Sequence, residues 1–249
     1  MEKKKTPLGY RMLKWLVKMF TPKMQVEGLE HLPEGGCMIV SNHAHLYGPI
    51  AAEIYLGSDR YTWCASQMMN LKEVPAYTFH EFWSMKPRYR LWFYRVLSHL
   101  IAPLAVYIFN CANTIPVYYD VRVMTTFRQT LRLLREGMKI VIFPEHTVAH
   151  NNIVYDFQEH FADVAQMYYS LTQQELCFVP MYISPKLKKM VLGEPVRYHH
   201  DQPMDEERKR ICQELMDAIT RIGRSLPPHT VVPYAVIPRK EYPSNRIDE

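Results

Sequence analysis

The 249-residue sequence lacks the cysteine pattern of a disulfide framework or a zinc site. Its five cysteines form no CxxC pair and follow none of the close spacings of small disulfide-rich domains. It also lacks a repeat period and any low-complexity tract, with nine glycines and eighteen prolines scattered along it. These absences exclude solenoids and disulfide-stapled scaffolds, and they favour one globular domain in a reducing compartment.

Net charge is almost missing outside the first eighteen residues. The formal charge is +5, and residues 1–18 hold six lysines and arginines against one acidic residue, whereas the rest of the chain holds 24 residues of each sign. A nucleic-acid-binding domain would carry a basic face across its fold. We therefore expect no nucleic-acid partner, and we expect a basic N-terminal segment that binds anionic membrane lipids on the cytoplasmic face.

Long uninterrupted apolar runs are absent too. The run over 13–20 contains Lys14 and Lys18, and the run over 91–109 contains Arg95, His99 and Pro103. A charged side chain is costly in a bilayer span, and the first run has no small-residue cleavage site. The sequence predicts neither a transmembrane helix nor a signal peptide.

Residues 8–20 predict an amphipathic helix, with apolar side chains on one stripe and basic ones largely elsewhere. We interpret it as a peripheral or monotopic membrane anchor, the alternative being a helix docked on the core. This divides the chain into a membrane-associating segment (1–22), a main domain (23–226) and a Pro-rich C-terminal tail (227–249) expected to be extended. The aromatic and basic stretch 83–95 is interpreted as a partly buried helix, the alternative being a membrane-facing belt.

Strands and helices alternate in the main domain. Buried strands are predicted over 37–41, 139–143 and 176–183, and helices over 125–136 and 205–225, with Gly137 ending the first helix. A helix that leads into a parallel strand is typical of α/β proteins. The predicted fold class is α/β, with a mixed, largely parallel sheet flanked by helices.

Four blocks in order, SNHAHLYGP, NTIPVYYD, FPEHT and CFVPMYISP, resemble the motifs of the glycerolipid and lysophospholipid acyltransferases over about residues 26–200. The resemblance implies their single-domain fold and transfer of a fatty acyl group to a lysophospholipid or related glycerolipid hydroxyl. It further implies acyl-CoA or acyl-carrier protein as co-substrate, and no metal or redox cofactor.

The resemblance places the catalytic base at His43, because an imidazole titrates near neutrality and can take the proton of a hydroxyl acceptor. The family's motif aspartate, which orients that histidine, falls on Gly48, and glycine can neither orient nor charge-balance an imidazole. His45 or Tyr47, or a carboxylate such as Glu53 or Glu145, is a candidate to support His43 instead.

The resemblance also suggests residues that bind the acceptor. They are Glu145, His146 and Thr147 of the FPEHT block, and Pro116, Tyr119 and Arg122 in and after the TIPV block. Both family arginines are replaced, by Val148 and at Tyr118–Tyr119, and arginine is the preferred residue for bidentate phosphate binding. Either Arg122 and His146 take over phosphate binding, or the acceptor is not the usual glycerol phosphate.

Two alternatives come from other functional classes. The chain could be a non-catalytic lipid-binding descendant of the same fold, as the replacement of the motif aspartate by Gly48 would suggest. It could also be a metal hydrolase, because His43-x-His45 and His146-xxx-His150 have ligand-like spacing and would gather four imidazoles if the two loops converge.

Overall fold

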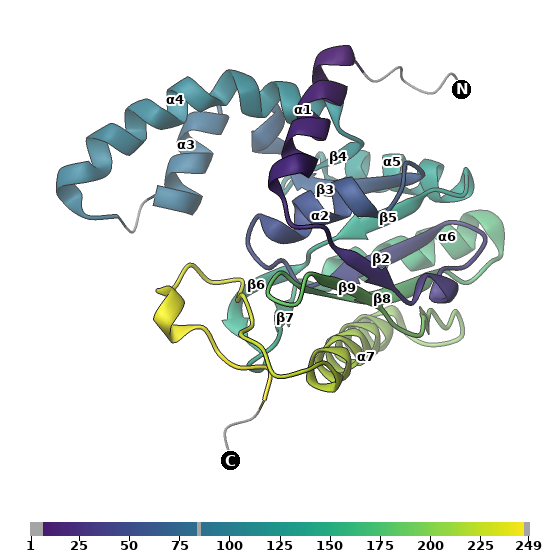
Figure 1. Ribbon diagram of the computed structural model, residues 1–249. Coiled ribbons are helices and arrows are strands. Elements are labelled where there is room, and N and C mark those ends of the chain that lie inside the picture. The colour runs from purple at the N-terminus through teal and green to yellow at the C-terminus, as the bar shows by residue number, and fades with distance from the viewer. Residues whose placement is uncertain (1–6, 84–85, 247–249) are drawn as a thin grey trace. The chain divides into compact units, whose positions relative to one another are not determined.

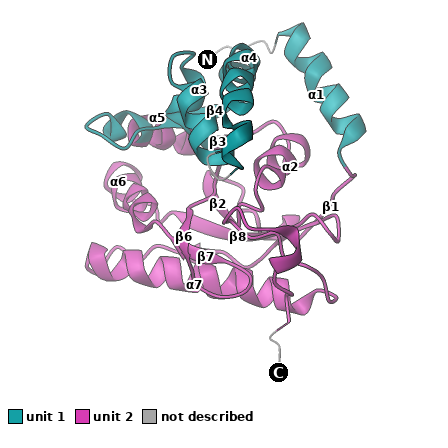
Figure 2. Cartoon of the chain, turned by 90° about the vertical axis from the view of Figure 1, so that its left-hand side faces the viewer, with its two compact units in different colours: residues 1–21, 63–126 teal, residues 22–62, 127–249 magenta. Residues whose placement is uncertain are grey.

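The computed structural model describes residues 7–83 and 86–246. Their contacts divide the chain into two compact units, each built from two stretches of sequence. Unit 1 comprises 1–21 and 63–126, and unit 2 comprises 22–62 and 127–249 (Figure 2). Lys3, Lys4 and Lys5, on which part of the charge argument depends, lie outside the described residues.

Helices and strands are interspersed along the chain (Figure 1). The helices are α1 (Leu8–Phe20), α2 (Tyr47–Tyr55), α3 (Val74–Thr78), α4 (Arg88–Cys111), α5 (Val123–Arg135), α6 (Asp163–Thr172) and α7 (Met204–Ser225). Single helical turns are η1 (Leu29–His31), η2 (Ser66–Met69), η3 (Phe79–Trp83), η4 (Glu159–Ala162) and η5 (Arg239–Glu241). The strands are β1 (Gln25–Glu27), β2 (Cys37–Ser41), β3 (Arg60–Ala65), β4 (Thr114–Val117), β5 (Lys139–Ile142), β6 (Glu145–Ala149), β7 (Tyr155–Phe157), β8 (Cys177–Ser184), β9 (Lys189–Leu192) and β10 (Val196–Arg197).

The main sheet has the strand order β1-β9-β8-β2-β5-β3-β4, with β10 paired to β8. Strand β2 runs parallel to both β5 and β8, whereas β9 and β10 are antiparallel to β8. The predicted mixed, largely parallel sheet flanked by helices is confirmed, and so is the N-terminal helix. Because β2 and β5 are neighbours in parallel, the chain segments that follow Ser41 and Ile142 leave the same edge of the sheet.

Both faces of the unit 2 sheet are covered, which is why β2 and β8 are buried along their whole length. On one face, Ile39, Val141 and Met181 pack with Ala51 and Ala52 of α2. On the other face, Phe178 meets Phe161 of η4 at 5.8 Å between ring centroids, and Tyr182 lies beside Gly223 of α7. The site described below lies at the edge of this doubly covered sheet where β2 and β5 end.

Helix α5 ends where the sequence predicts. Gly137 adopts a left-handed backbone (φ 79°), and its N–H donates to the Leu134 carbonyl at 3.0 Å. A side chain would make this conformation costly, so glycine ends the helix and turns the chain into β5.

Unit 1 exposes many large apolar side chains. In α1 these are Leu8, Met12, Trp15, Leu16, Met19 and Phe20, and in α4 they are Tyr89, Trp92, Phe93, Val96, Leu100, Leu104 and Tyr107. Within the described part of 83–95, Tyr89 and Trp92 are each 70% exposed, whereas Leu91 and Tyr94 are half-buried, so the helix that begins at Arg88 is partly buried on one face and exposed on the other. Aromatic composition alone could not distinguish a buried helix from an exposed one.

Among the described residues one helix, α4, is long and apolar enough to cross a membrane, by length and composition alone. Its most apolar window has a mean hydropathy of 1.4, and 11% of that window is buried. The sequence-based prediction of no transmembrane helix depends on Arg95, His99 and Pro103. All three lie within α4.

The C-terminal segment over 227–246 is not an extended tail. It contains η5 and a bridge between Thr230 and Ser244, and Asn245 is fully buried. Asn245 donates from its amide to the Gly223 carbonyl at 2.9 Å and accepts from the His229 N–H at 2.8 Å. Proline content correctly predicts irregular backbone here, but these buried hydrogen bonds fix the segment on unit 2.

Candidate active site

The site lies in unit 2, where the loops after β2 and β5 meet. Asn42 and His43 follow β2, and Phe143, Pro144 and Glu145 follow β5, so the parallel pairing brings the two sequence blocks together. Asn42 fixes the end of β2 to β8, because its amide donates to the Ile183 carbonyl at 3.1 Å and accepts from the Ile183 N–H at 2.8 Å. The Asn42 side chain thereby ties the backbone before His43 to β8 through two hydrogen bonds.

Glu145 links the two loops from within the core. Only 3% of it is exposed, and its carboxylate accepts from the His43 N–H at 2.5 Å and from the Tyr155 N–H at 2.8 Å. Burial raises its pKa to about 7, although both backbone hydrogen bonds oppose that shift. Glu145 therefore positions the backbone of His43 and does not contact its ring through these bonds.

The ring of His43 is oriented by a main-chain carbonyl. Nδ1 lies 2.6 Å from the carbonyl oxygen of His45, and a carbonyl only accepts, so Nδ1 carries the proton. The lone pair is then on Nε2, which is the tautomer that a general base needs. Burial lowers the pKa of His43 below its usual value, which keeps the imidazole neutral at physiological pH.

Two aromatic rings flank the His43 ring. Phe143 lies at 5.2 Å and Tyr234 of the C-terminal segment at 5.8 Å, measured between ring centroids. Tyr234 also lies 5.9 Å from the ring of Tyr155, the residue whose N–H binds Glu145. These rings cover part of the His43 ring and contribute to the burial that lowers its pKa.

The turn that carries the orienting carbonyl is strained and closely packed. Ala44 and His45 both have left-handed backbones, with φ of 46° and 53°, a conformation that costs about 1–2 kcal/mol for a residue with a side chain. The Gly48 N–H donates to the His43 carbonyl at 3.2 Å, and a Cβ built on Gly48 would lie 2.3 Å from that oxygen. The absence of a side chain at Gly48 thus allows the turn that aims the His45 carbonyl at His43.

The other candidate supports of His43 lie elsewhere. Tyr47 is 47% exposed at the first turn of α2, and within the part of the chain that the structure describes it makes no hydrogen bond or ring contact with the His43 ring. Glu53 is engaged by Arg60, whose Nη2 lies 2.5 Å from the Glu53 carboxylate. The group that takes the place of the aspartate is therefore the backbone carbonyl of His45. The sequence indicates His45 as a candidate but does not indicate which of its groups supports His43.

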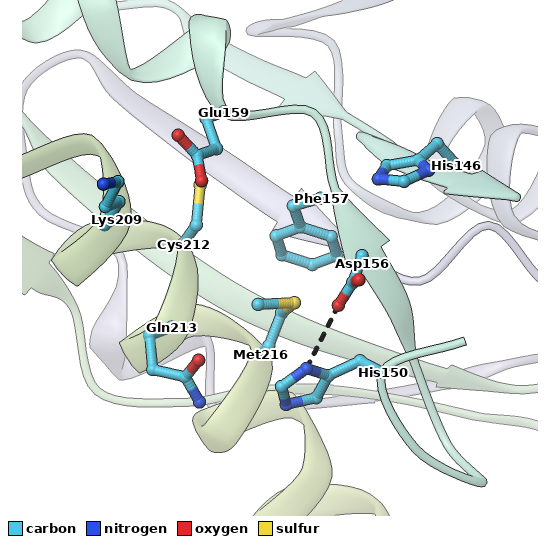
Figure 3. Close-up of a pocket in the computed structure, with 9 residues that line it drawn as sticks. All are labelled: His146, His150, Asp156, Phe157, Glu159, Lys209, Cys212, Gln213 and Met216. Atoms are coloured by element: carbon cyan, nitrogen blue, oxygen red, sulfur yellow. Dashed lines mark hydrogen bonds and ion pairs between the residues drawn. The ribbon is translucent and has the colours of Figure 1, made fainter. Parts of the chain in front are cut away.

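The histidines predicted to gather for a metal do not converge. His146 and His150 line a cavity of about 330 Å³ between the β6–β7 hairpin and α7, and neither His43 nor His45 belongs to its lining (Figure 3). His150 Nδ1 lies 3.2 Å from an oxygen of Asp156. Within 7–83 and 86–246, no group of three or more metal-binding side chains is present.

The remaining acceptor-site candidates belong to different units of the chain. Thr147 is exposed on β6. In unit 1, Pro116 lies on β4 and Tyr119 follows that strand, 72% exposed. The Arg122 guanidinium pairs with both carboxylate oxygens of Asp120, with Nε 3.0 Å from Oδ1 and Nη2 2.7 Å from Oδ2. A phosphate would have to displace Asp120 to bind Arg122 in a bidentate manner.

The family model described as Acyltransferase matches residues 23–184, more than half of the chain. The chain belongs to the acyltransferase family. This acyltransferase-family chain is also similar to the 1-acyl-sn-glycerophosphate (LPA) acyltransferase PlsC from Thermotoga maritima, with 14% identity, a TM-score of 0.49, and coverage of 86% of this chain and 79% of that one. No curated protein matches it.

Sequence reasoning missed four contributors to the site of this acyltransferase-family chain: Asn42, Tyr155, Tyr234, and Tyr242, whose ring stacks on the ring of His45. Asn42 directly precedes His43, so its position at the end of a strand was a usable signal. The two C-terminal tyrosines lie beyond the residues that the family model matches, in a Pro-rich stretch with no helix or strand period. Nothing in the sequence pairs them with His43.

Proposed function

We propose that the protein is a peripheral membrane acyltransferase that moves a fatty acyl group from acyl-CoA or acyl-carrier protein to a lysophospholipid or related glycerolipid hydroxyl. The observation that carries this proposal is the tautomer of His43, whose Nδ1–H is donated to a carbonyl so that Nε2 is a base. The family match supports the reaction class. No metal or redox cofactor is needed for this chemistry.

In the proposed reaction the acceptor hydroxyl gives its proton to Nε2 of His43 while its oxygen attacks the thioester carbonyl carbon. The tetrahedral intermediate then breaks its carbon–sulfur bond, and His43 returns the proton to the departing thiolate. A carbonyl holds the imidazole in the correct tautomer, as a carboxylate would, but does not balance the charge of the imidazolium. We therefore expect transfer to be slower than with an aspartate-supported histidine.

Membrane association is proposed from the exposed faces of unit 1. The apolar side chains of α1 and α4 form a surface that water solvates poorly, and both helices carry exposed basic residues, among them Arg11, Lys18, Arg88 and Arg95. Apolar insertion combined with attraction to anionic headgroups is how interfacial helices bind bilayers. We assign α1 and α4 to the cytoplasmic face of a membrane, with α4 lying in the interface.

The experiment is thiol release from acyl-CoA and acyl-carrier protein over a panel of lysophospholipid, glycerol phosphate and non-phosphate acceptors. We expect acceptor-dependent release by the wild type, its loss in His43→Ala, and its retention in the matched control His160→Ala, whose side chain is 83% exposed. Binding of lysolipid without thiol release from any donor would overturn the proposal and indicate a lipid-binding protein of the same fold.

A further inference from the structure

The C-terminal segment brings a tyrosine to the residue that orients His43. The ring of Tyr242 stacks on the ring of His45 at 6.2 Å between centroids with 24° between the planes, and the Tyr242 hydroxyl lies 3.3 Å from His45 Nε2. Through its carbonyl, His45 in turn accepts the hydrogen bond from His43 Nδ1. A continuous set of contacts therefore leads from Tyr242 to the ring of the base.

We propose that Tyr242 is a positioning residue, which holds His45 in its left-handed conformation so that the His45 carbonyl keeps His43 in its basic tautomer. This inference rests on the proposed acyltransferase function and assigns a role to a segment beyond the family match. An imidazole without a fixed acceptor at Nδ1 interconverts between tautomers, and only one of them presents a lone pair on Nε2.

The position of His45 needs an external support. Ala44 and His45 are two consecutive left-handed residues with side chains, and such backbones persist only where the surroundings hold them. The hydrogen bonds of Gly48 and Tyr47 to the carbonyls of His43 and Ala44 close the turn on one side. On the side of the His45 ring, the support comes from Tyr242.

Tyr242 can act as a support because the segment that carries it is itself fixed. His229 Nδ1 donates to the Pro227 carbonyl at 2.8 Å, so its Nε2 accepts from the buried Tyr182 hydroxyl, also at 2.8 Å. The Val231 N–H donates to the Pro243 carbonyl at 2.9 Å, directly beside Tyr242. In the turn between β6 and β7, the Asn152 amide donates to the Ser244 carbonyl at 2.6 Å.

The structure offers a graded pair of variants and a matched control. Tyr242→Phe removes one hydroxyl and keeps the stacked ring, whereas Tyr242→Leu removes both contacts with His45. Tyr169 stacks on His200 in the same way, at 4.3 Å and 17°, but neither residue is part of the site. Tyr169→Leu therefore removes a similar tyrosine–histidine stack without touching His45.

The test combines steady-state kinetics with ¹⁵N NMR of the full-length chain labelled at histidine, each variant being checked for an unchanged fold by its melting temperature. We expect kcat to fall about tenfold in Tyr242→Phe and about a hundredfold in Tyr242→Leu at unchanged KM, since a well-placed base contributes about 10²- to 10⁴-fold. The His43 resonances should move from a pure Nδ1–H tautomer toward a mixture in the same order, and Tyr169→Leu should resemble the wild type.

The two readouts separate failure of this inference from failure of the proposed function. The wild type could show no acyl transfer while its His43 is a pure Nδ1–H tautomer that Tyr242→Leu disturbs. That result would refute the acyltransferase function and support the positioning role of Tyr242. An unchanged tautomer in both Tyr242 variants would overturn the inference, whatever their kcat, because a loss of activity alone would then reflect a merely structural role.

Discussion

Replacing Gly48 by alanine or aspartate should destabilise the protein and should not restore an aspartate-supported histidine. A Cβ at this position would lie 2.3 Å from the His43 carbonyl oxygen and 3.0 Å from Phe143 Cε1, whereas ordinary contacts begin at 3.4 Å. The oxygen cannot move away easily, because Glu145 holds the N–H of the same residue and Asn42 ties the preceding residue to β8. Overpacking of this kind costs about 2 kcal/mol.

The assay is thermal unfolding of Gly48→Ala and Gly48→Asp beside the matched control Gly35→Ala, where a new Cβ has no neighbour within 4 Å. For a chain of this length, about 2 kcal/mol corresponds to a fall in melting temperature of about 4–8 °C. Both Gly48 variants should show that fall, and thiol release should also decrease because the turn that holds the His45 carbonyl is pushed open. A Gly48→Asp protein as stable as Gly35→Ala and more active than the wild type would refute the reasoning.

Two further predictions concern Glu145 and α4. Burial raises the Glu145 pKa from 4.5 to about 7, so the folded state is stabilised by the protonated carboxyl group. This contribution to the free energy of unfolding is complete below pH 4.5 and is lost as the pH rises through 7, by about 3 kcal/mol at about 1.36 kcal/mol per pKa unit. Urea unfolding of Glu145→Gln should therefore show a flatter pH dependence between these values than the wild type, and an unchanged slope would contradict the assignment. The double variant Trp92→Ser, Leu100→Ser, at two exposed positions of α4, should reduce co-sedimentation with anionic vesicles at unchanged stability. The control Leu171→Ser, at an exposed position in unit 2, should bind vesicles like the wild type. Equal binding by all variants would contradict the assignment of α4 to the membrane surface.

The sequence predicts the three adjacent central strands of the sheet, β2, β5 and β8, because each is a short apolar run bounded by turn residues, but it does not predict the strands outside them. The strand over 37–41 and the helix over 8–20 have the predicted limits, and the proximity of His43 and Glu145 follows from the parallel pairing of β2 and β5. Residues 83–95 were harder to interpret, since an aromatic stretch has the same composition whether it packs against a core or faces a membrane.

The detailed site depends on information that residue identities do not carry. His43 is oriented by a backbone carbonyl, and every residue has one, so only the left-handed conformation of Ala44 and His45 distinguishes the carbonyl that matters. Tyr234 and Tyr242 reach the site from nearly two hundred residues away, as the 197-residue separation of Tyr242 from His45 illustrates. Such contacts depend on tertiary packing and have no local sequence pattern.

The central claim is that a partly buried His43, oriented by a carbonyl, is the base of acyl transfer, and the pH dependence of kcat/KM tests it most directly. This profile reports the ionisation of the free enzyme, and a base works only when unprotonated. Because burial lowers the His43 pKa, the account predicts that kcat/KM rises with pH to a plateau through a midpoint below 6.5, and that His43→Ala abolishes the reaction. A midpoint above 6.5, as a carboxylate partner would produce, or full transfer by His43→Ala, would contradict it.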